Sequence, residues 1–159
     1  MVERETETKL SQEIQTLVTI LRHQKFVAHF LVKFAHALEN RAIAHDQSKL
    51  SLEEFGGFVN VQRIAREQPY NSPDYKAVIS SQTVQLHFKR NSHHQEFYAS
   101  GIADMSLFDI IEMVIDWKAA SLTYGQTSLK DSLKVQIERF SLRSEHLYLI
   151  QLILAELEN

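Results

Sequence analysis

The sequence predicts an all-α protein, and two patterns carry this prediction. Apolar residues recur every three or four positions along most of the chain, which is the spacing of one helix face. Only 4 glycines and 2 prolines occur, too few for the many turns of a β-sandwich or barrel, and no alternating segment competes as a strand. With 159 residues, of which 44% are apolar, the chain can bury a sizeable core. We therefore expect one compact domain over residues 1–159, built of six or seven helices.

The first third of the chain is expected to hold a long helix and a short one. Apolar residues at helical spacing over residues 10–34 predict the long helix. Asn40 is expected to end it, and a shorter helix is expected over residues 41–49. Ser51, with Glu54 three residues later, forms a capping-box pattern that predicts the start of the next helix.

Loop signals divide the remainder of the chain. Both prolines lie in residues 67–74, the clearest loop, and the Ser-Pro pair inside it is expected to open a helix over residues 72–97. A capping pattern at residues 106–109 starts a strongly amphipathic helix, which Gly125 ends. A C-terminal helical hairpin is expected over residues 127–157. Its apolar residues lie on more than one side, which favours a homodimer.

The composition excludes several classes of function. Lys and Arg total 17 against 20 Asp and Glu, and no polybasic run occurs, so binding to a nucleic-acid polymer or an anionic membrane is not expected. The absence of cysteine excludes disulfides, thiolate metal sites and a cysteine nucleophile. No apolar segment reaches the roughly 18 residues of a membrane span, and the charged N-terminus lacks a signal core, so we expect a cytoplasmic protein. The unusual count is 8 histidines.

A first group of polar residues is His45-Asp46 with Lys49. Adjacent helical residues point about 100° apart, so His45 and Asp46 can reach one metal ion only near a helix end or at an inward-facing corner. The alternative is an ordinary i,i+3 ion pair between Asp46 and Lys49 on a solvated face.

A second group lies in the segment LHFKRNSHHQEF. His87, Asn91 and His94 fall at i, i+4 and i+7, which places them on one face of the expected helix, with His93 turned away. Imidazoles at this spacing suit a divalent metal or, when protonated, a phosphate. The alternative is a polar stripe with one or two buried, hydrogen-bonded histidines.

A third group is acidic. Asp109, Glu112 and Asp116 share one face of an otherwise apolar helix, where three like charges repel one another unless a cation or basic residues neutralise them. Asp109 is accounted for by the helix start near Ser106. Glu112 and Asp116 lie near the apolar side, where unpaired carboxylates are costly, so we expect them to be paired or metal-bound.

Taken together, these segments resemble a family of small, largely uncharacterised helical proteins of bacteria and their phages. The family pattern is His-Asp-x-Ser-Lys with a following Glu, then His-x3-Asn-x-His-His, then Met-x3-Asp-x2-Glu-Met-x2-Asp-Trp. The matching segments are HDQSKLSLEEF (45–55), LHFKRNSHHQEF (86–97) and GIADMSLFDIIEMVIDWKAAS (101–121). His23 also matches, and the resemblance covers about residues 20–122. Gln95 departs from it, because the family usually has Pro after the paired histidines.

The order of these polar residues is similar to that of HD-domain metal-dependent phosphohydrolases, which implies an HD-domain-like fold and a divalent metal ion (Mn, Fe, Co, Ni, Zn or Mg). By this similarity, the metal ligands are His23, His45, Asp46 and Asp116. The residues that bind phosphate, or complete a second metal site, are drawn from His87, His93 and His94. We expect His87, Asn91 and His94 on the rim of the pocket, where the neighbouring Lys89 and Arg90 favour an anionic substrate.

Two functions follow as hypotheses. The first is a metal-dependent phosphohydrolase acting on a small phosphate ester such as a nucleotide. In this hypothesis Asp46 binds the metal and orients a water molecule, Lys49 offsets phosphate charge, and Glu112 is the spare acid or base. The second is a non-catalytic helical interaction module whose His/acid cluster holds a structural metal or forms a buried network. The sequence leaves open whether the protein is an enzyme.

Overall fold

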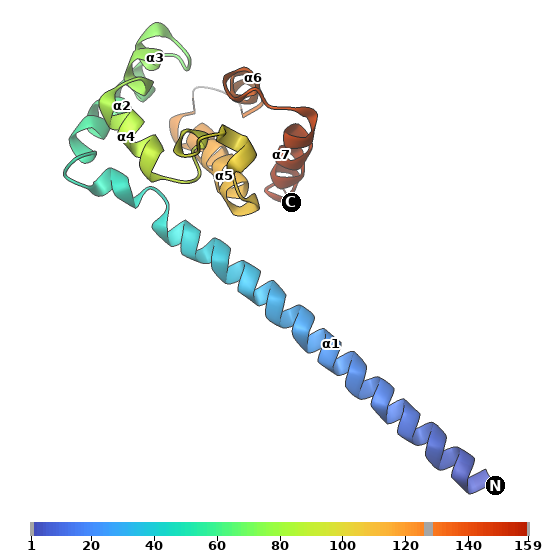
Figure 1. The fold of residues 1–159 in the computed structure, drawn as a ribbon. Helices are drawn as coiled ribbons and strands as arrows, with labels where there is room; N and C mark the ends of the chain where they lie inside the picture. Colours follow the sequence, from blue (N-terminus) through green and yellow to red (C-terminus); the bar gives the residue numbers. More distant parts are fainter. Residues whose placement is uncertain (1, 126–128, 159) are drawn as a thin grey trace. The chain divides into compact units, whose positions relative to one another are not determined.

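The computed structural model describes residues 2–125 and 129–158, and every regular element in those ranges is helical (Figure 1). Seven α-helices are found there, in agreement with the six or seven helices that the sequence predicts, and three short 3-10 helices accompany them. The chain divides into two compact units, Met1–Ile43 and Ala44–Asn159. None of the described helices is both long and apolar enough to cross a membrane.

The N-terminal unit consists of one helix, α1 (Val2–Ala44). The expected break at Asn40 and the separate helix over residues 41–49 are wrong, because α1 continues to Ala44 and is followed by the 3-10 helix η1 (Gln47–Leu50). A single asparagine inside a long helix costs well under about 1 kcal/mol, which is too little to end it. No other described element of this unit covers the apolar side chains of α1, so Leu17, Phe30 and Leu31 are more than half exposed.

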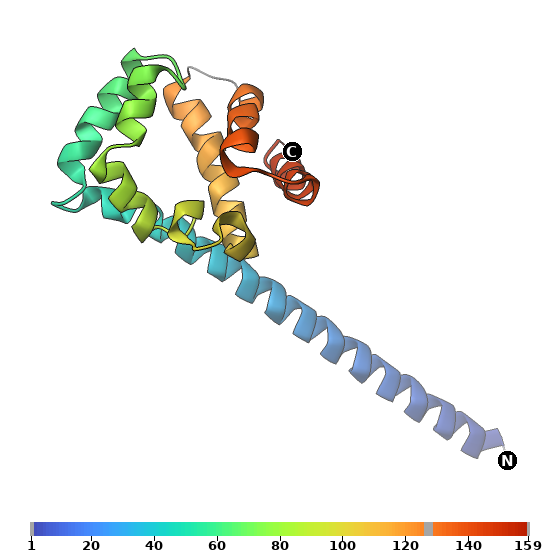
Figure 2. The same cartoon turned by 45° about the horizontal axis from the view of Figure 1, so that its top comes forward.

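In the C-terminal unit, α2 (Phe55–Glu67) lies beside α3 (Pro73–Ile79) and α4 (Gln82–Arg90), as Figure 2 shows. The expected single helix over residues 72–97 is wrong. Ser80 and Ser81 separate α3 from α4, because Ser81 takes an extended conformation at the N-cap, a position that serine favours.

Gly57 allows α2 and α4 to approach closely. A Cβ atom at Gly57 would lie 2.0 Å from the Thr83 hydroxyl oxygen of α4, whereas one at Gly56 would meet nothing within 4 Å. Gly57 therefore sets the spacing between α2 and α4. This spacing matters because α2 begins directly after Glu54 and α4 carries His87, two residues of the site described below.

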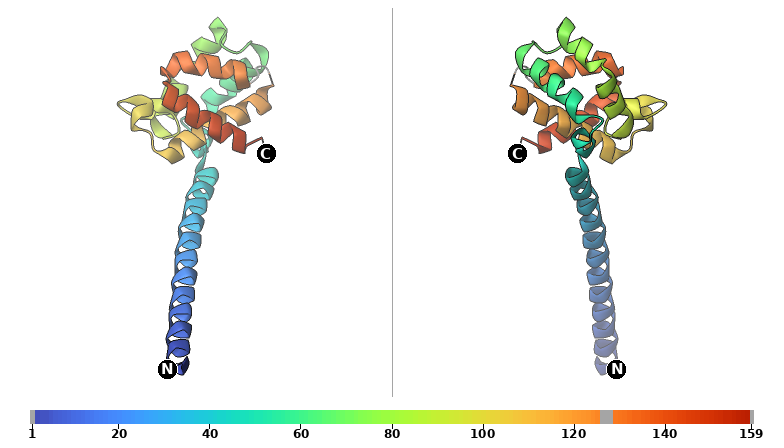
Figure 3. Two further views of the ribbon diagram at one scale, coloured as in Figure 1. Left: turned by 90° about the vertical axis from the view of Figure 1, so that its right-hand side faces the viewer. Right: turned by 90° about the vertical axis from the view of Figure 1, so that its left-hand side faces the viewer.

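The amphipathic helix is α5 (Leu107–Tyr124), which begins with the predicted capping box and ends at Gly125 in the left-handed conformation (φ 64°). It is followed by α6 (Leu129–Phe140) and α7 (Ser144–Glu156), which both contact α5 (Figure 3). Thr127, expected to begin the penultimate helix, lies outside the described residues. The apolar core joins these three helices through Ile102, Met105, Ile110, Met113, Val114, Phe140, Leu142 and Ile150.

Helix α7 buries one side chain and leaves others outside. Ile150 is fully buried, whereas Tyr148 and Leu152 are 65% and 49% exposed, and Leu157, directly after the helix, is 41% exposed. The observation behind the expected homodimer is therefore present in the structure, and self-association itself stays a prediction.

Candidate metal centre

Asp46 is the central residue of the site. It lies between the end of α1 and η1 and adopts the left-handed conformation (φ 57°, ψ 13°), which aspartate tolerates better than most residues and which is common at functional sites. Its Oδ1 atom lies 3.1 Å from His87 Nε2 and 3.5 Å from His93 Nε2. Its Oδ2 atom contacts the Lys49 ammonium group and lies 3.4 Å from His45 Nε2. The carboxylate thus faces two sets of side chains.

The more buried set is Asp46, His87, His93 and His94, whose candidate ligand atoms all lie within 4.8 Å of one another. Asp46 Oδ1 and the Nε2 atoms of the three histidines are buried and have no hydrogen-bond partner among the residues that the structure describes. The carboxylate and imidazole atoms approach to 3.1–3.5 Å without the alignment of hydrogen bonds.

These distances fit a common cation. With metal–ligand bonds of about 2.1 Å, neighbouring ligand atoms lie roughly 3.0 Å apart in octahedral and roughly 3.4 Å apart in tetrahedral coordination. Leaving four buried polar atoms without partners is costly, and imidazole with carboxylate is a donor set that divalent metals such as Zn, Mn and Fe accept. The residues present therefore fit a divalent metal ion.

Behind His87 lies a second layer of polar contacts. His87 Nδ1 is 3.0 Å from Glu54 Oε2, and Glu54 is completely buried. The Ser48 hydroxyl also donates to Glu54, and Asn91 donates to Ser48 (2.9 Å each). The Arg90 guanidinium balances the Glu54 charge at 3.2 Å. A carboxylate on the far ring nitrogen is the usual support of a metal-binding histidine, because it fixes the ring and its tautomer.

Glu112 of α5 supports two other imidazoles. Its Oε1 atom lies 3.1 Å from His93 Nδ1 and 2.8 Å from His45 Nδ1. The Nε2 side of both rings then faces Asp46. Glu112 is thus in contact with two of the candidate ligands, as a residue that orients both rings would be.

A second, more open set is His45, Asp46 and Asp116, with His45 Nε2 3.6 Å from Asp116 Oδ1. The carboxylates of Asp116, Asp46 and Glu112, in that order of effect, raise the pKa of His45 to about 11. A protonated His45 therefore holds these carboxylates together when no metal is bound. Burial raises the pKa of Asp46, but contacts with His45, His87 and Lys49 outweigh this effect and hold the pKa well below its ordinary value.

His94 is held neutral. Burial, followed by the neighbouring His93 and His87, lowers its pKa to about 2. Its ring lies tilted against that of His93, with the ring centroids 4.2 Å apart and an interplanar angle of 44°. Since a metal binds the neutral imidazole, this environment suits His94 to coordination better than to pairing with phosphate as a cation.

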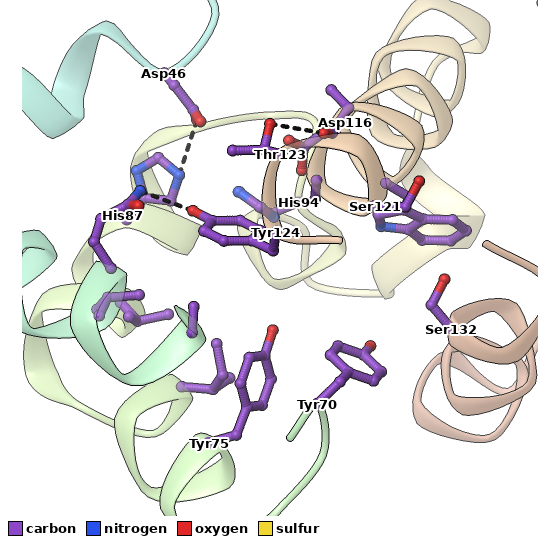
Figure 4. A pocket seen from close by; sticks show the side chains of 18 of the residues that line it. Asp46, Tyr70, Tyr75, His87, His94, Asp116, Ser121, Thr123, Tyr124 and Ser132 are labelled. Atoms are coloured by element: carbon purple, nitrogen blue, oxygen red, sulfur yellow. Dashed lines mark hydrogen bonds and ion pairs between the residues drawn. The ribbon is translucent and has the colours of Figure 1, made fainter. Parts of the chain in front are cut away.

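A pocket of about 410 Å³ opens beside this site (Figure 4). Asp46, His87, His94 and Asp116 line one end. Lys49 also lines the pocket. Other wall residues come from α2, the loop that follows it, α3, α5 and α6, and include Phe58, Val61, Tyr70, Tyr75, Trp117, Tyr124, Gln136 and Arg139. The volume lies within the range of small-molecule sites, roughly 300–1,000 Å³.

This arrangement agrees in part with the site that the sequence predicts. His45, Asp46 and Asp116 come together, as expected. The expectation that His93 turns away is wrong, because His93 is 3% exposed and faces Asp46 and Glu112.

The helical spacing invoked for His87, Asn91 and His94 is also wrong. The helix ends at Arg90 and His94 lies beyond it, yet the turn that follows brings His94 back to His87, with ring centroids 5.0 Å apart. Asn91 donates to Ser48 and to the His87 carbonyl oxygen. His87 is 1% exposed, so it lies inside the site rather than on its rim.

Three further residues complete the comparison with the predicted site: Asp109, His23 and Glu54. Asp109 caps α5, as expected, and also accepts hydrogen bonds from Ser92 and Tyr98 (2.7 Å each). His23 lies on α1, in the other unit, and belongs to none of the candidate ligand groups among the described residues, so its role stays a prediction. Glu54 was missed because it matched a capping box at Ser51, whereas α2 begins at Phe55 and the Glu54 side chain serves His87.

Comparison with known proteins adds a family but no activity. Neither the curated proteins nor the solved structures gave a match. A family model, described as a family of unknown function (DUF5662), matches residues 12–159, which include the whole cluster and the pocket. The chain therefore belongs to the DUF5662 family.

Proposed function

We propose that the protein is a metal-dependent phosphohydrolase that acts on a small phosphate ester such as a nucleotide. The observation that carries the proposal is the position of four buried ligand atoms, on Asp46, His87, His93 and His94, beside a pocket of about 410 Å³. None of these atoms has a hydrogen-bond partner among the residues that the structure describes. A divalent cation bound by these atoms would lower the pKa of a bound water and polarise a phosphoryl oxygen.

The side chains around the cation position have separate tasks in this proposal. Lys49 lines the pocket beside Asp46, and its ammonium group offsets phosphate charge as that charge grows on the leaving oxygen. Glu112 orients His45 and His93 rather than acting as a free acid or base, because its Oε1 atom contacts both rings. Asp116, which lines the pocket and lies beside His45, is better placed to accept a proton from water.

The two sets around Asp46 offer two cation positions with different exposure. His87 and His93 of the inner set are almost fully buried, whereas the side chains of His45 and Asp116 remain 29% and 27% exposed. With one carboxylate facing both sets, Asp46 is suited to bridge two cations, an arrangement that stabilises attacking and leaving oxygens together.

The alternative is a structural metal or a buried His/acid network in a helical interaction module. A structural site is closed by protein ligands, whereas a catalytic site keeps a position open to water or substrate. The pocket reaches Asp46, His87, His94 and Asp116 themselves, which supports the catalytic proposal over the closed alternative.

The experiment measures metal content and hydrolysis on untagged protein. We expect at least one equivalent of divalent metal by elemental analysis and metal-dependent release of phosphate from a panel of nucleoside monophosphates. His87→Ala should lose both, while His36→Ala, at an exposed histidine of α1, should lose neither. Metal binding without hydrolysis of any phosphate ester would favour the structural alternative, and failure to bind any divalent metal would overturn both metal readings.

A further inference from the structure

The end of the pocket away from the metal cluster contains an unexplained polar group. Gln136 of α6 is 8% exposed and lines the pocket. Its Nε2 atom donates to the Tyr70 hydroxyl at 3.1 Å, but its buried Oε1 atom has no hydrogen-bond partner within the described part of the chain. A buried amide oxygen without a donor lowers the stability of the free protein, so a ligand that supplies the donor would recover that free energy on binding.

The surroundings of Gln136 define the shape of the ligand. Tyr70 and Tyr75 lie edge to face with ring centroids 5.0 Å apart, and Trp117 and Tyr124 line the same pocket (Figure 4). Burial raises the pKa of Tyr75 to about 12, so its hydroxyl stays neutral. Aromatic walls with neutral hydroxyl groups favour a flat, uncharged ring.

We propose that this tyrosine end of the pocket (Tyr70, Tyr75 and Gln136) binds a flat nitrogen heterocycle that bears an amino group, and that the amino N–H donates to Gln136 Oε1. The inference rests on the proposed function, because the heterocycle is then the organic part of the phosphate ester whose phosphate reaches the metal cluster. Gln136 would be a specificity-determining residue and not a catalytic one, since it touches the ring and not the reacting atoms.

The test compares ligands that differ only in the amino group. One pair is adenosine 5′-monophosphate and purine riboside 5′-monophosphate, and the other is cytidine 5′-monophosphate and its analogue without the 4-amino group. Affinities are measured by calorimetry on the full chain in EDTA, where no turnover occurs. In at least one pair the amino-bearing ligand should bind about tenfold more tightly, the effect of one hydrogen bond to an otherwise unpaired buried group.

Gln136→Met should remove this discrimination, because methionine has a similar shape and no amide oxygen. The same change at Gln85, an exposed glutamine that does not line the pocket, should leave it intact. Equal affinities within both pairs, discrimination that persists in Gln136→Met, or no binding of any of the four ligands would overturn the inference. Those outcomes are distinct from failure of the proposed function, which is a failure to bind metal or to hydrolyse any phosphate ester.

Discussion

Helix α5 contributes one face to the apolar core and another face to the cluster of histidines and acids. These two regions differ in whether their buried groups have partners within the protein. Ile110, Met113 and Val114 pack into the apolar core with residues of α6 and α7. Glu112 and Asp116, from the same helix, face the histidines of the cluster. The core is complete without any other molecule, whereas the cluster leaves several buried nitrogen and oxygen atoms without partners among the described residues.

This difference indicates what each region does. Apolar packing stabilises the fold by removing surface from water and needs no ligand. A cluster with unpartnered buried atoms lowers the stability of the metal-free protein, and such groups persist where they serve binding or catalysis. We therefore expect core substitutions to act equally with and without metal, and cluster substitutions to act mainly through the metal.

The largest expected effect is in the core. Val114 is fully buried, and Val114→Asp would place an unpaired carboxylate in the apolar cluster, which should cost more than about 4 kcal/mol and prevent folding at any metal concentration. Ile115→Asp, one residue further and 41% exposed, is the matched control and should fold. Circular dichroism melts of both variants check this, and a Val114→Asp variant that folds when metal is added would break the distinction between the regions.

Metal removal should have the next largest effect. At a metal concentration about a thousand times the dissociation constant, binding adds roughly 4 kcal/mol, which for a chain of this size raises the melting temperature by about 8–16 °C. His94→Ala should abolish most of this gain if the more buried set (Asp46, His87, His93 and His94) binds the cation more tightly. His45→Ala should abolish it if the more open set (His45, Asp46 and Asp116) does. Thermal melts with and without chelator measure the stabilisation by metal. Equal melting temperatures for metal-loaded and metal-depleted wild-type protein would contradict the prediction.

Asp109 tests the boundary between the two regions. Burial raises its pKa, but hydrogen bonds from Ser106, Ser92 and Tyr98 outweigh burial and lower the pKa to about 2, from an ordinary value of 3.8. A carboxylate with a lowered pKa stabilises the fold fully above about pH 4, and this contribution is lost as pH falls toward 2. Asp109→Asn should therefore destabilise the metal-free protein by about 1–3 kcal/mol above pH 4, and by less at lower pH.

The same variant should leave metal binding unchanged, because Asp109 belongs to none of the candidate ligand groups among the described residues. Urea unfolding at several pH values and a metal titration give the two measurements. A large loss of metal affinity in Asp109→Asn would show that the helix start and the cluster are not independent.

Local signals in the sequence were enough for parts of both regions. The start and end of α5 were predicted because the capping box at Ser106 and the left-handed Gly125 act over a few residues. The joining of His45, Asp46 and Asp116 was predicted from a resemblance of motifs, which carries information about tertiary contacts that periodicity lacks.

What the sequence did not predict depends on contacts between distant segments. His93 faces Glu112 only because the chain turns after α4, and the pairing of Glu54 with His87 joins residues 33 positions apart. Neither has a local signature, and Glu54 also fits a capping role. The break at Ser80-Ser81 has a local signal that was missed: residues 80–83 are all polar, and Ser81 is the N-cap of α4.

The smallest expected effect concerns the adjacent glycines of α2, which separate local from tertiary effects within one turn of helix. Gly56→Ala should stabilise the protein by about 0.5–1 kcal/mol, because Gly56 has open space around it and alanine favours the helix. Gly57→Ala should instead destabilise it by about 1–3 kcal/mol, because the new Cβ would overlap Thr83 and push α2 away from α4. Glu54 directly precedes α2 and contacts His87 of α4, so moving the two helices apart would disturb this pair. Gly57→Ala should therefore also weaken metal binding, whereas Gly56→Ala should not. Urea unfolding and metal titration of both variants check the pair, and unchanged metal affinity in a destabilised Gly57→Ala variant would show that the cluster tolerates movement of α2.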